Sequence, residues 1–539
     1  MASTDQQILE ASAKHPPAPN HKYQYGTAGF RMKADLLDSV VFRCGLIAAL
    51  RSRQLQGKTI GVMITASHNP PEDNGVKLVD PLGSMLEAEW EELSTRIANT
   101  NNDDEVVSVY NEIARLYHID LAVPAQVVFA RDTRASGSRL ASCLVDGLTA
   151  AGAEFIDYNI LTTPQLHYMV RCINTQGTSQ EYGEATEEGY YTKFSNAFKR
   201  AMGNKTSTGA LTVDCANGVG GPKLTELIKY LPSNEVLQIK VVNDNVHQPE
   251  SLNVDCGADY VKTSQKAPPS SKAGPGDRCC SLDGDADRVV YYFKDESNTF
   301  HLLDGDRIAT LAASFIGDLC RQCGLAEEVK IGVVQTAYAN GSSTKYIEQD
   351  LKLEVKCTAT GVKHLHHAAE RLDVGVYFEA NGHGTVIFSD RALKKLAKLE
   401  PKSPAQLAAL ETLRALVDLI NQSVGDALTD MLLVEVILAR KSWGPLEWLQ
   451  TYNDLPNRLV KVKVHNRNLF TTEDAERRLV TPAAAQKGID EAVKKVRNGR
   501  SFARPSGTED VVRVYAEAAT KAEADDLAAK VSSIITANQ

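Results

Sequence analysis

Short apolar runs alternate with helical patterns along most of the chain. Ile60–Ile64, Gln126–Ala130 and Ile331–Val334 are apolar runs bounded by turn residues, which predicts buried strands. Leu36–Arg53 and Glu87–Ala98 carry apolar residues at helical spacing, which predicts helices. The repeated strand–turn–helix order predicts several α/β domains with largely parallel sheets.

The C-terminal part follows a different pattern. Arg458–Val464 and Val511–Ala518 alternate between apolar and polar residues, as half-buried strands do, and each is followed by a predicted helix, at Pro482–Val496 and Lys521–Thr536. The segment 262–278 is rich in Pro, Gly, Ser and Lys, and its composition predicts a flexible loop. We therefore expect a last domain of α+β type.

Length and charge narrow the class of protein. The chain has 539 residues, which at about 100–200 residues per domain predicts three or four domains. Its net charge of −9 and pI near 5.8 disfavour a surface that binds polyanions. The N-terminus lacks the basic start and apolar core of a signal peptide, and no run approaches about 18 apolar residues. We expect no nucleic-acid or membrane partner, and the oligomeric state stays open.

The ten cysteines are scattered along the chain. Cys320 and Cys323 form a close pair within a helical pattern, but no second pair follows at zinc spacing, so structural thiols are expected. Free cysteines suit a reducing compartment, which predicts a cytoplasmic location.

Ser67 follows the predicted strand Ile60–Ile64 and lies in the sequence Thr-Ala-Ser-His-Asn-Pro, residues 65–70. Proline at positions 70 and 71 limits the freedom of this turn. A serine in such a place is most often a turn former or a helix cap. A catalytic role for Ser67 therefore depends on the rest of the chain.

Three carboxylates follow one another at alternate positions: Asp283, Asp285 and Asp287. In an extended loop their oxygens lie on one side and repel one another unless a cation neutralises them. An EF-hand loop is excluded, because its sixth and twelfth positions are occupied by Arg288 and Lys294. All-oxygen ligands in a short loop suit Mg²⁺. The alternative is an acidic turn exposed to solvent.

Two further polar loops are candidates for substrate binding. The segment 379–384, Glu-Ala-Asn-Gly-His-Gly, lies between two strand patterns; a hairpin explains its glycines and Asn381 but not Glu379 or His383. A carboxylate beside an amide can bind sugar hydroxyls. The segment 504–509, Arg-Pro-Ser-Gly-Thr-Glu, can surround an anion with backbone N–H groups, hydroxyls and a guanidinium, and Arg513 projects from the next strand. A plain turn is the alternative for each.

These four elements, in this order, resemble the α-D-phosphohexomutase superfamily over nearly the whole chain. Four segments are similar in sequence to the eukaryotic phosphoacetylglucosamine mutases: Tyr25–Arg31, Thr65–Pro70, Phe378–Gly384 and Arg504–Asp510. Phosphoglucomutases carry a Glu-Ser turn in the sugar loop and bacterial relatives a Ser-Gly-His turn, whereas Asn381 fills that place here.

The resemblance implies three related α/β domains and a C-terminal α+β domain around a central cleft. The expected domains are 1–178 with the phosphoserine loop, 179–295 with the Mg²⁺ loop, 296–430 with the sugar loop and 431–539 with the phosphate loop. It also implies an isomerase that interconverts N-acetylglucosamine 6-phosphate and 1-phosphate, with Mg²⁺ as cofactor and a sugar bisphosphate as intermediate and activator, in the biosynthesis of UDP-N-acetylglucosamine.

The same resemblance assigns roles to residues. Ser67 would carry the phosphate and, with Asp283, Asp285 and Asp287, would hold Mg²⁺. Sugar hydroxyls would bind to Glu379, Asn381 and Gly382. The phosphate that does not react would bind to Arg504, Ser506, Gly507, Thr508 and Arg513. Positions near the transferring phosphoryl group are Arg31, His68, Lys77, Arg288 and His383, of which Lys77 and His383 are the candidates for general acid and base.

Three rival functions stay open. Another phosphohexomutase, acting on glucose or mannose phosphates, has the same motifs in outline. A non-catalytic sugar-phosphate-binding protein would have lost the chemistry. A phosphatase would pass the phosphate of Ser67 to water.

Overall fold

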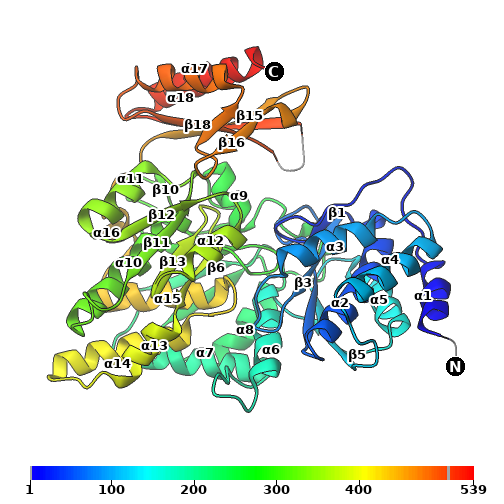
Figure 1. Cartoon of the computed structure of the whole chain (residues 1–539). Helices are drawn as coiled ribbons and strands as arrows, with labels where there is room; N and C mark the ends of the chain where they lie inside the picture. Colours follow the sequence, from blue (N-terminus) through cyan, green and yellow to red (C-terminus); the bar gives the residue numbers. More distant parts are fainter. Residues whose placement is uncertain (1–2, 507–509) are drawn as a thin grey trace. The chain divides into compact units, whose positions relative to one another are not determined.

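The computed structural model describes residues 3–506 and 510–539. The chain forms two compact units, and Figure 1 labels most of their helices and strands. The first contains Met1–Leu302 and Ala415–Ser442, and the second contains Leu303–Arg414 and Trp443–Gln539. The chain thus returns to the first unit late in the sequence, where α15 (Ala427–Lys441) packs against α7 (Glu187–Met202).

The first unit contains two five-stranded sheets. One has the order β1-β3-β2-β4-β5, with its strands, in that order, at Phe30–Lys33, Asp73–Val79, Ile60–Ile64, Ala125–Arg131 and Ala153–Ile160. The other has the order β10-β9-β8-β6-β7, with its strands at Phe300–Leu303, Val289–Lys294, Arg278–Leu282, Ala210–Asp214 and Gln238–Val242. The predicted strands at Ile60–Ile64 and Gln126–Ala130 are confirmed.

The helices of the first unit confirm the predicted patterns in most places. They are α1 (Thr4–Ser12), α2 (Asp38–Gln54), α3 (Ala88–Ala98), α4 (Asp103–Leu116), α5 (Gly137–Ala150), α6 (Thr163–Thr175), α7, α8 (Gly220–Tyr230), α9 (Gly257–Ser264) and α15. The predicted loop 262–278 begins too early, because buried Val261 holds the chain in α9 as far as Ser264.

The second unit contains a four-stranded sheet of order β12-β11-β13-β14, with its strands at Glu354–Thr358, Ile331–Thr336, Val374–Phe378 and Gly384–Phe388. Its remaining helices are α10 (Gly305–Gln322), α11 (Gly341–Lys345), α12 (Val362–Ala369), α13 (Asp390–Lys398), α14 (Pro404–Leu419, which crosses the division between the units) and α16 (Pro445–Leu449).

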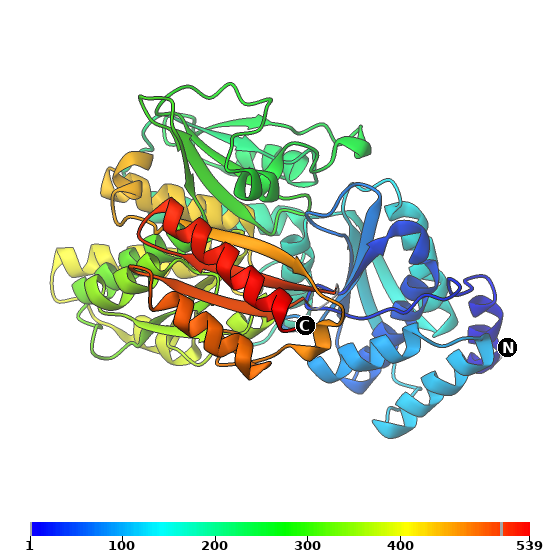
Figure 2. The same ribbon diagram turned by 90° about the horizontal axis from the view of Figure 1, so that it is seen from above.

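The C-terminal part of the second unit is built on antiparallel strands. The sheet β15-β19-β18 comprises Asn457–Lys463, Val511–Glu517 and Arg500–Pro505, and the hairpin β16–β17 comprises Thr471–Glu473 and Arg478–Thr481. Figure 2 shows α17 (Ala483–Val493) and α18 (Lys521–Ala537) side by side over this sheet. The α+β prediction is confirmed.

The three α/β sheets share one spatial order. Each has a core of three parallel strands and a fourth, antiparallel strand: β3-β2-β4-β5, β9-β8-β6-β7 and β14-β13-β11-β12. Each sheet thus has the predicted, largely parallel core and adds an antiparallel strand beside it, because a short turn reverses the chain after β2, β8 and β13. The Ser67, Asp283–Asp287 and Glu379–His383 loops are these three turns.

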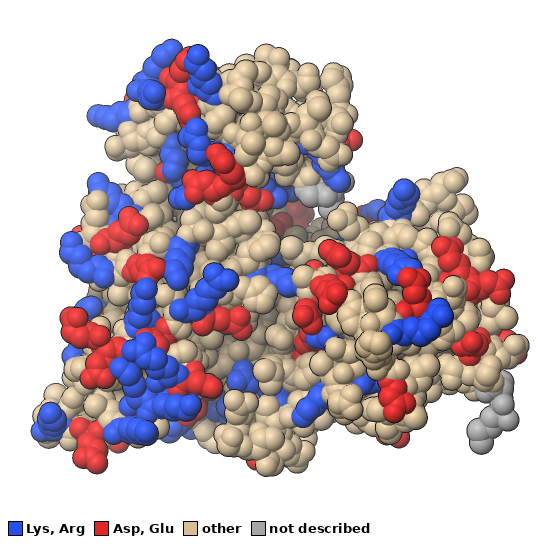
Figure 3. All heavy atoms as spheres, viewed as in Figure 1, with Lys and Arg blue, Asp and Glu red and all other residues tan. Residues whose placement is uncertain are grey.

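Charged side chains are interspersed over the face drawn in Figure 3, where Lys and Arg lie among Asp and Glu. Among the described residues, the helices are all too short or too polar to cross a membrane.

Candidate active site

Ser67 lies at the turn between β2 and β3, and its backbone has a left-handed conformation with φ of 52°. The side chain is fully buried. Its N–H donates to Thr65 Oγ1 at 2.9 Å, and its hydroxyl donates to Asp283 Oδ2 at 2.6 Å. His68 Nδ1 lies 3.4 Å from the same hydroxyl oxygen. The turn therefore fixes one hydroxyl against one carboxylate.

Arg134 holds this turn from behind. Its guanidinium donates to four carbonyl oxygens of the turn, at 2.6–2.9 Å: those of Ser67, Asn69, Pro70 and Asp73. Its Nε donates to Asp132 Oδ2 at 3.0 Å, and that oxygen also accepts from Thr65. Burial raises the pKa of Asp132, while Arg134 opposes that rise. Arg134 therefore fixes the backbone that carries Ser67.

Arg134 and Asn253 were not predicted to belong to the site. Asn253 Nδ2 donates to the carbonyls of Ser67 and Asn69 at 2.9 and 3.1 Å. The signal for Arg134 was the charged run 131–134 after β4, which could have been recognised as a second loop at the same sheet edge. Asn253 had no comparable signal, because it lies in an irregular segment.

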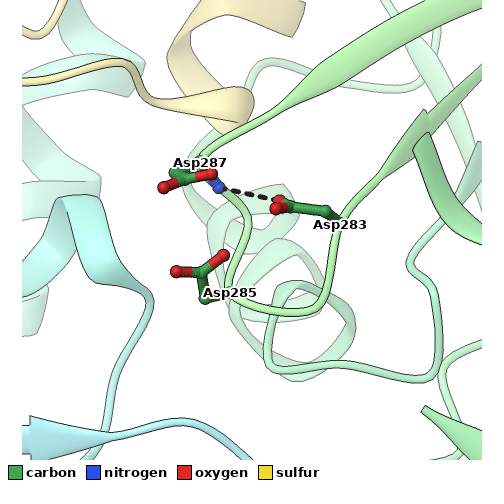
Figure 4. Close-up of side chains that lie close together, drawn as sticks. All are labelled: Asp283, Asp285 and Asp287. Atoms are coloured by element: carbon green, nitrogen blue, oxygen red, sulfur yellow. Dashed lines mark hydrogen bonds between the residues drawn. The ribbon is translucent and has the colours of Figure 1, made fainter. Parts of the chain in front are cut away.

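The three aspartates converge in the turn between β8 and β9 (Figure 4). One oxygen of each lies within 4.8 Å of the others, and all three side chains are buried. Asp283 Oδ1 accepts the N–H groups of Asp287 and Arg288, both at 3.1 Å. Burial, followed by the charges of Asp287 and Asp285, raises the pKa of Asp283 well above its usual range.

This turn lies against the serine turn at Gly284. A Cβ atom built on Gly284 would lie 2.5 Å from the Ser67 carbonyl oxygen, so a side chain there would separate the two turns. Glycine is thus required by close approach of two backbones.

The donor set fits a divalent cation. Three buried carboxylates repel one another in the folded protein, and a cation relieves that repulsion. Asp285 Oδ1 is buried and accepts no hydrogen bond from the described residues. Carboxylate oxygens are ligands that Mg²⁺ prefers.

Cationic side chains surround the carboxylates. Lys77 Nζ lies 3.8 Å from Asp285 and 3.7 Å from Asp287, and Arg288 Nε lies 3.8 Å from Asp283 and from Asp287. Burial lowers the pKa of Arg31, and the three aspartates oppose that change. The first unit thus brings Ser67, the aspartates, Arg31, Lys77 and Arg288 into one cluster.

His68 is neutral in this cluster. The charge of Arg288, then burial and then Arg31 lower the pKa of His68 to about 2. A phosphate on Ser67 would place negative charge beside the imidazole and oppose this effect.

The sugar-loop residues occupy the turn between β13 and β14 in the second unit. The Glu379 carbonyl accepts the N–H of Gly382 at 2.9 Å, and Asn381 Oδ1 accepts the N–H of His383 at 3.0 Å. Glu379 and Asn381 are half-buried, and His383 is buried. The hairpin predicted from Asn381 and the glycines is confirmed, and it leaves the Glu379 and Asn381 side chains 3.5 Å apart.

Arg504 and Arg513 face each other across β18 and β19, where their Cα atoms are direct partners. Like charges at directly opposite positions destabilise a sheet unless an anion lies between or beside them. Ser506 is buried after β18. The predicted ligands Gly507 and Thr508 lie outside the described residues.

Glu476 supplies an anion in this structure. Its Oε1 lies 3.3 Å from Arg504 Nε, and its Oε2 accepts the N–H and the hydroxyl of Thr360 at 2.9 and 2.5 Å. Glu476 belongs to a run of three left-handed residues at the tip of the β16–β17 hairpin. Glu476 was not predicted, because the sequence of a hairpin tip does not indicate which distant residue it contacts.

Profiles of known families match four successive parts of the chain. Residues 181–290 and 304–443 match domains II and III of phosphoacetylglucosamine mutase AMG1. Residues 47–105 and 91–179 match the alpha/beta/alpha domain I of phosphoglucomutase/phosphomannomutase, and residues 459–534 match the C-terminal domain of that family.

Full-length relatives agree with these matches. The phosphoacetylglucosamine mutase of Sus scrofa is 52% identical over 536 residues, which cover 97% of this chain and 96% of the relative. The crystal structure of Aspergillus fumigatus N-acetylphosphoglucosamine mutase with GlcNAc-6P and magnesium is 62% identical, with a TM-score of 0.96 and full coverage of both chains. An alanine variant of the same fungal enzyme, with glucose 1,6-bisphosphate, gives the same values.

Proposed function

The chain belongs to the phosphoacetylglucosamine mutase family of the α-D-phosphohexomutase superfamily, and from this premise we propose that it works through a phosphorylated Ser67. The enzyme is an isomerase that interconverts N-acetylglucosamine 6-phosphate and N-acetylglucosamine 1-phosphate. Its product is the precursor used in the biosynthesis of UDP-N-acetylglucosamine.

The observation that carries the proposal is the contact between Ser67 and the buried carboxylates. The Ser67 hydroxyl lies 2.6 Å from Asp283 in a turn that Arg134 holds through four carbonyls. A serine hydroxyl is a weak nucleophile at neutral pH, so an enzyme that already carries the phosphate avoids activating it in each turnover.

Asp283, Asp285 and Asp287 are the residues that would hold Mg²⁺, together with the phosphate on Ser67. When bound, the ion would neutralise charge on the phosphoryl oxygens. Lys77, Arg31 and Arg288 add positive charge to the same cluster, which stabilises the charge that develops during phosphoryl transfer.

The transfer itself exchanges one phosphate ester for another. The bond between Ser67 Oγ and phosphorus breaks, and the sugar hydroxyl oxygen forms a bond to the same phosphorus. The proton of the sugar hydroxyl passes to a base, for which Lys77 and His383 are the candidates. Ser67 Oγ takes a proton from a general acid, for which the same two residues are the candidates, and becomes the hydroxyl that donates to Asp283 here.

The sugar bisphosphate formed in this way reorients and returns its other phosphate to Ser67. Glu379, Asn381 and Gly382 are proposed to bind the sugar, since a carboxylate and an amide 3.5 Å apart can bind neighbouring hydroxyls. Arg504 and Arg513, with Ser506, Gly507 and Thr508, are proposed to bind the phosphate that does not react. One such site serves both orientations of the bisphosphate.

We propose the domain division 1–178, 179–295, 296–430 and 431–539 for this enzyme. The matches to four successive family domains support a division into four. Limited proteolysis followed by mass spectrometry would locate the accessible boundaries; cuts confined to the interior of these segments would contradict the division.

We also propose that the enzyme works in the cytoplasm. All ten cysteines are free thiols, nine of them buried. Fractionation of cells that make the full-length protein would test this location, with an exclusively secreted or organellar protein as the contrary result.

The test of function is an assay of the purified full-length protein with Mg²⁺ and a trace of glucose 1,6-bisphosphate. N-acetylglucosamine 6-phosphate and glucose 6-phosphate are compared at equal concentrations, and the 1-phosphate products are measured. We expect a strong preference for the acetamido sugar and a phosphoryl group on Ser67 in the intact mass.

The other outcomes identify the rivals. Equal or better use of glucose 6-phosphate would keep the mechanism and change the substrate. Release of inorganic phosphate in place of the isomer would indicate a phosphatase. No product from either sugar would indicate a binding protein.

A further inference from the structure

Helix α6 begins at the metal loop with two adjacent threonines that have different tasks. Thr162 caps the helix: its hydroxyl accepts the N–H of Gln165, and the Gln165 side chain accepts the N–H of Thr162, both at 3.1 Å. Thr163 is the next residue, and its side chain has no part in this cap.

Thr163 contacts Asp285 twice, although 122 residues separate them in the chain. Its hydroxyl donates to Asp285 Oδ2 at 2.6 Å, and its N–H donates to the Asp285 carbonyl at 3.2 Å. Both side chains are fully buried, so water does not compete for either bond. The first turn of α6 thus binds both the backbone and the carboxylate of Asp285.

These contacts distinguish the two oxygens of Asp285. Oδ2 accepts from Thr163 and lies 3.8 Å from Lys77 Nζ, whereas Oδ1 accepts no hydrogen bond from the described residues. A buried carboxylate oxygen without a partner is unfavourable, which a cation at Oδ1 would relieve.

Other hydrogen bonds to the metal loop bind groups other than the Asp285 carboxylate. Val219 and Ala427 donate their N–H groups to the carbonyls of Gly284 and Ala286, at 3.2 and 3.1 Å. Asp283 is held by Ser67 and by two N–H groups of its own loop. Among the described residues, Thr163 alone donates a side-chain hydrogen bond to the Asp285 carboxylate.

We propose that Thr163 is a positioning residue of the metal site: it engages Asp285 Oδ2 and thereby presents Oδ1 to Mg²⁺. This inference rests on the proposed function in one respect, that Asp285 is a metal ligand. In this proposal Thr163 acts through Asp285, which it contacts with its hydroxyl and its N–H. It sets the orientation of a ligand, as hydrogen-bond partners of metal ligands commonly do.

The chemistry of the contact requires a hydroxyl. Thr163→Val keeps the shape of the side chain and removes the donor. Without that hydrogen bond, the Asp285 carboxylate is no longer held with Oδ2 toward residue 163 and Oδ1 toward the metal. Partners of metal ligands typically contribute about 10- to 100-fold to metal affinity. Thr163→Ser keeps the donor and removes only a methyl group.

The experiment measures metal binding by the full-length protein without substrate. Mn²⁺, a paramagnetic substitute for Mg²⁺, is titrated and free Mn²⁺ is followed by electron paramagnetic resonance; the rise in Tm on addition of Mg²⁺ is a second readout. Wild type, Thr163→Val, Thr163→Ser, Thr162→Ala and Asp285→Asn are compared. Thr163→Ala replaces Thr163→Val if the valine variant does not fold.

We expect Thr163→Val to weaken Mn²⁺ binding at least tenfold and Thr163→Ser to remain within about threefold of wild type. Thr162→Ala should lower Tm through the lost cap and leave Mn²⁺ affinity unchanged. Wild-type affinity in Thr163→Val, or an equal loss of affinity in Thr162→Ala, would overturn the proposal. Failure of the wild type to bind Mn²⁺, or of Asp285→Asn to weaken binding, would instead refute the metal site on which it rests.

Discussion

The carboxylates of the metal loop and the arginines of β18 and β19 differ in how neighbouring groups fix their side chains. In the first unit, Asp283 and Asp285 are buried and accept hydrogen bonds from Ser67 and Thr163 at 2.6 Å, and Asp283 accepts two more from backbone N–H groups at 3.1 Å. In the second unit, Arg504 Nε lies 3.3 Å from Glu476 Oε1. The two groups form an ion pair, but the Nε–H of Arg504 makes no hydrogen bond with the described residues. The metal loop is therefore fixed in advance, whereas the arginine pair has a partner that a ligand can replace.

The difference suits the two tasks. Phosphoryl transfer needs fixed geometry, because small displacements of reacting groups reduce the rate strongly. A site that must bind the phosphate of two different sugar orientations gains from a weaker, exchangeable partner. Variants of the serine turn should accordingly change kcat, and variants of the arginine pair should change KM.

The largest effect is expected from Ser67→Ala. Without the hydroxyl the enzyme cannot carry phosphate, and loss of a nucleophile typically reduces kcat by roughly 10⁴-fold or more. The measurement is formation of N-acetylglucosamine 1-phosphate, with intact mass to show that the phosphoryl group is absent. Normal turnover by a folded Ser67→Ala protein would refute the phosphoserine mechanism.

Arg134→Lys should come next. Lysine cannot reach the carbonyls of Ser67, Asn69, Pro70 and Asp73 at once, so the serine turn should shift. We expect kcat to fall about 100-fold, the loss typical of a small misplacement, with KM changed little.

Arg131→Lys is the matched control for Arg134→Lys, since Arg131 lies three residues away and pairs with Asp157. Equal loss in both variants would mean that Arg134 acts through general stability rather than through the serine turn.

Arg504→Ala should act on KM. A hydrogen bond to a charged group contributes about 1.5–3 kcal/mol, which corresponds to a rise in KM of roughly 10- to 150-fold. Steady-state kinetics with N-acetylglucosamine 6-phosphate would measure it. Arg477→Ala, which removes the exposed ion pair with Asp474, is the control. A fall in kcat at unchanged KM would place Arg504 in the chemistry rather than in binding.

The smallest effect is expected from Glu476→Gln. In the proposed site the substrate phosphate replaces this carboxylate at Arg504, and a glutamine competes less well. A partly exposed ion pair contributes about 0.2–1 kcal/mol, so KM should fall by roughly 1.4- to 5-fold, and less at high salt. A higher KM would instead indicate that Glu476 orients Arg504 for binding.

The sequence was informative where function lies in a short run of residues. Ser67, the three aspartates and the Glu379–His383 hairpin were located because turn residues and charges stand close together in the chain. The strand β3 was missed: its Asp-Asn-Gly start at 73–75 resembles a turn, yet Asn74 is buried and donates to Ser136.

Long-range partners could not be predicted in the same way. Thr163 contacts Asp285 across 122 residues, and Glu476 contacts Thr360 across 116. Each is an ordinary residue in its own segment, at the start of a helix or the tip of a hairpin. Only the packing of distant segments gives them their partners.

The three α/β sheets have the same spatial order of strands, but their strands do not follow one another in the same order along the chain. In the second and third sheets the parallel strands β6 and β7, or β11 and β12, precede the hairpin, whereas in the first sheet the hairpin β2–β3 precedes β4 and β5. The first sheet is thus a circular permutation of the other two. Evolution could move the chain ends of such a sheet without moving its loop, provided that the hairpin itself stayed intact.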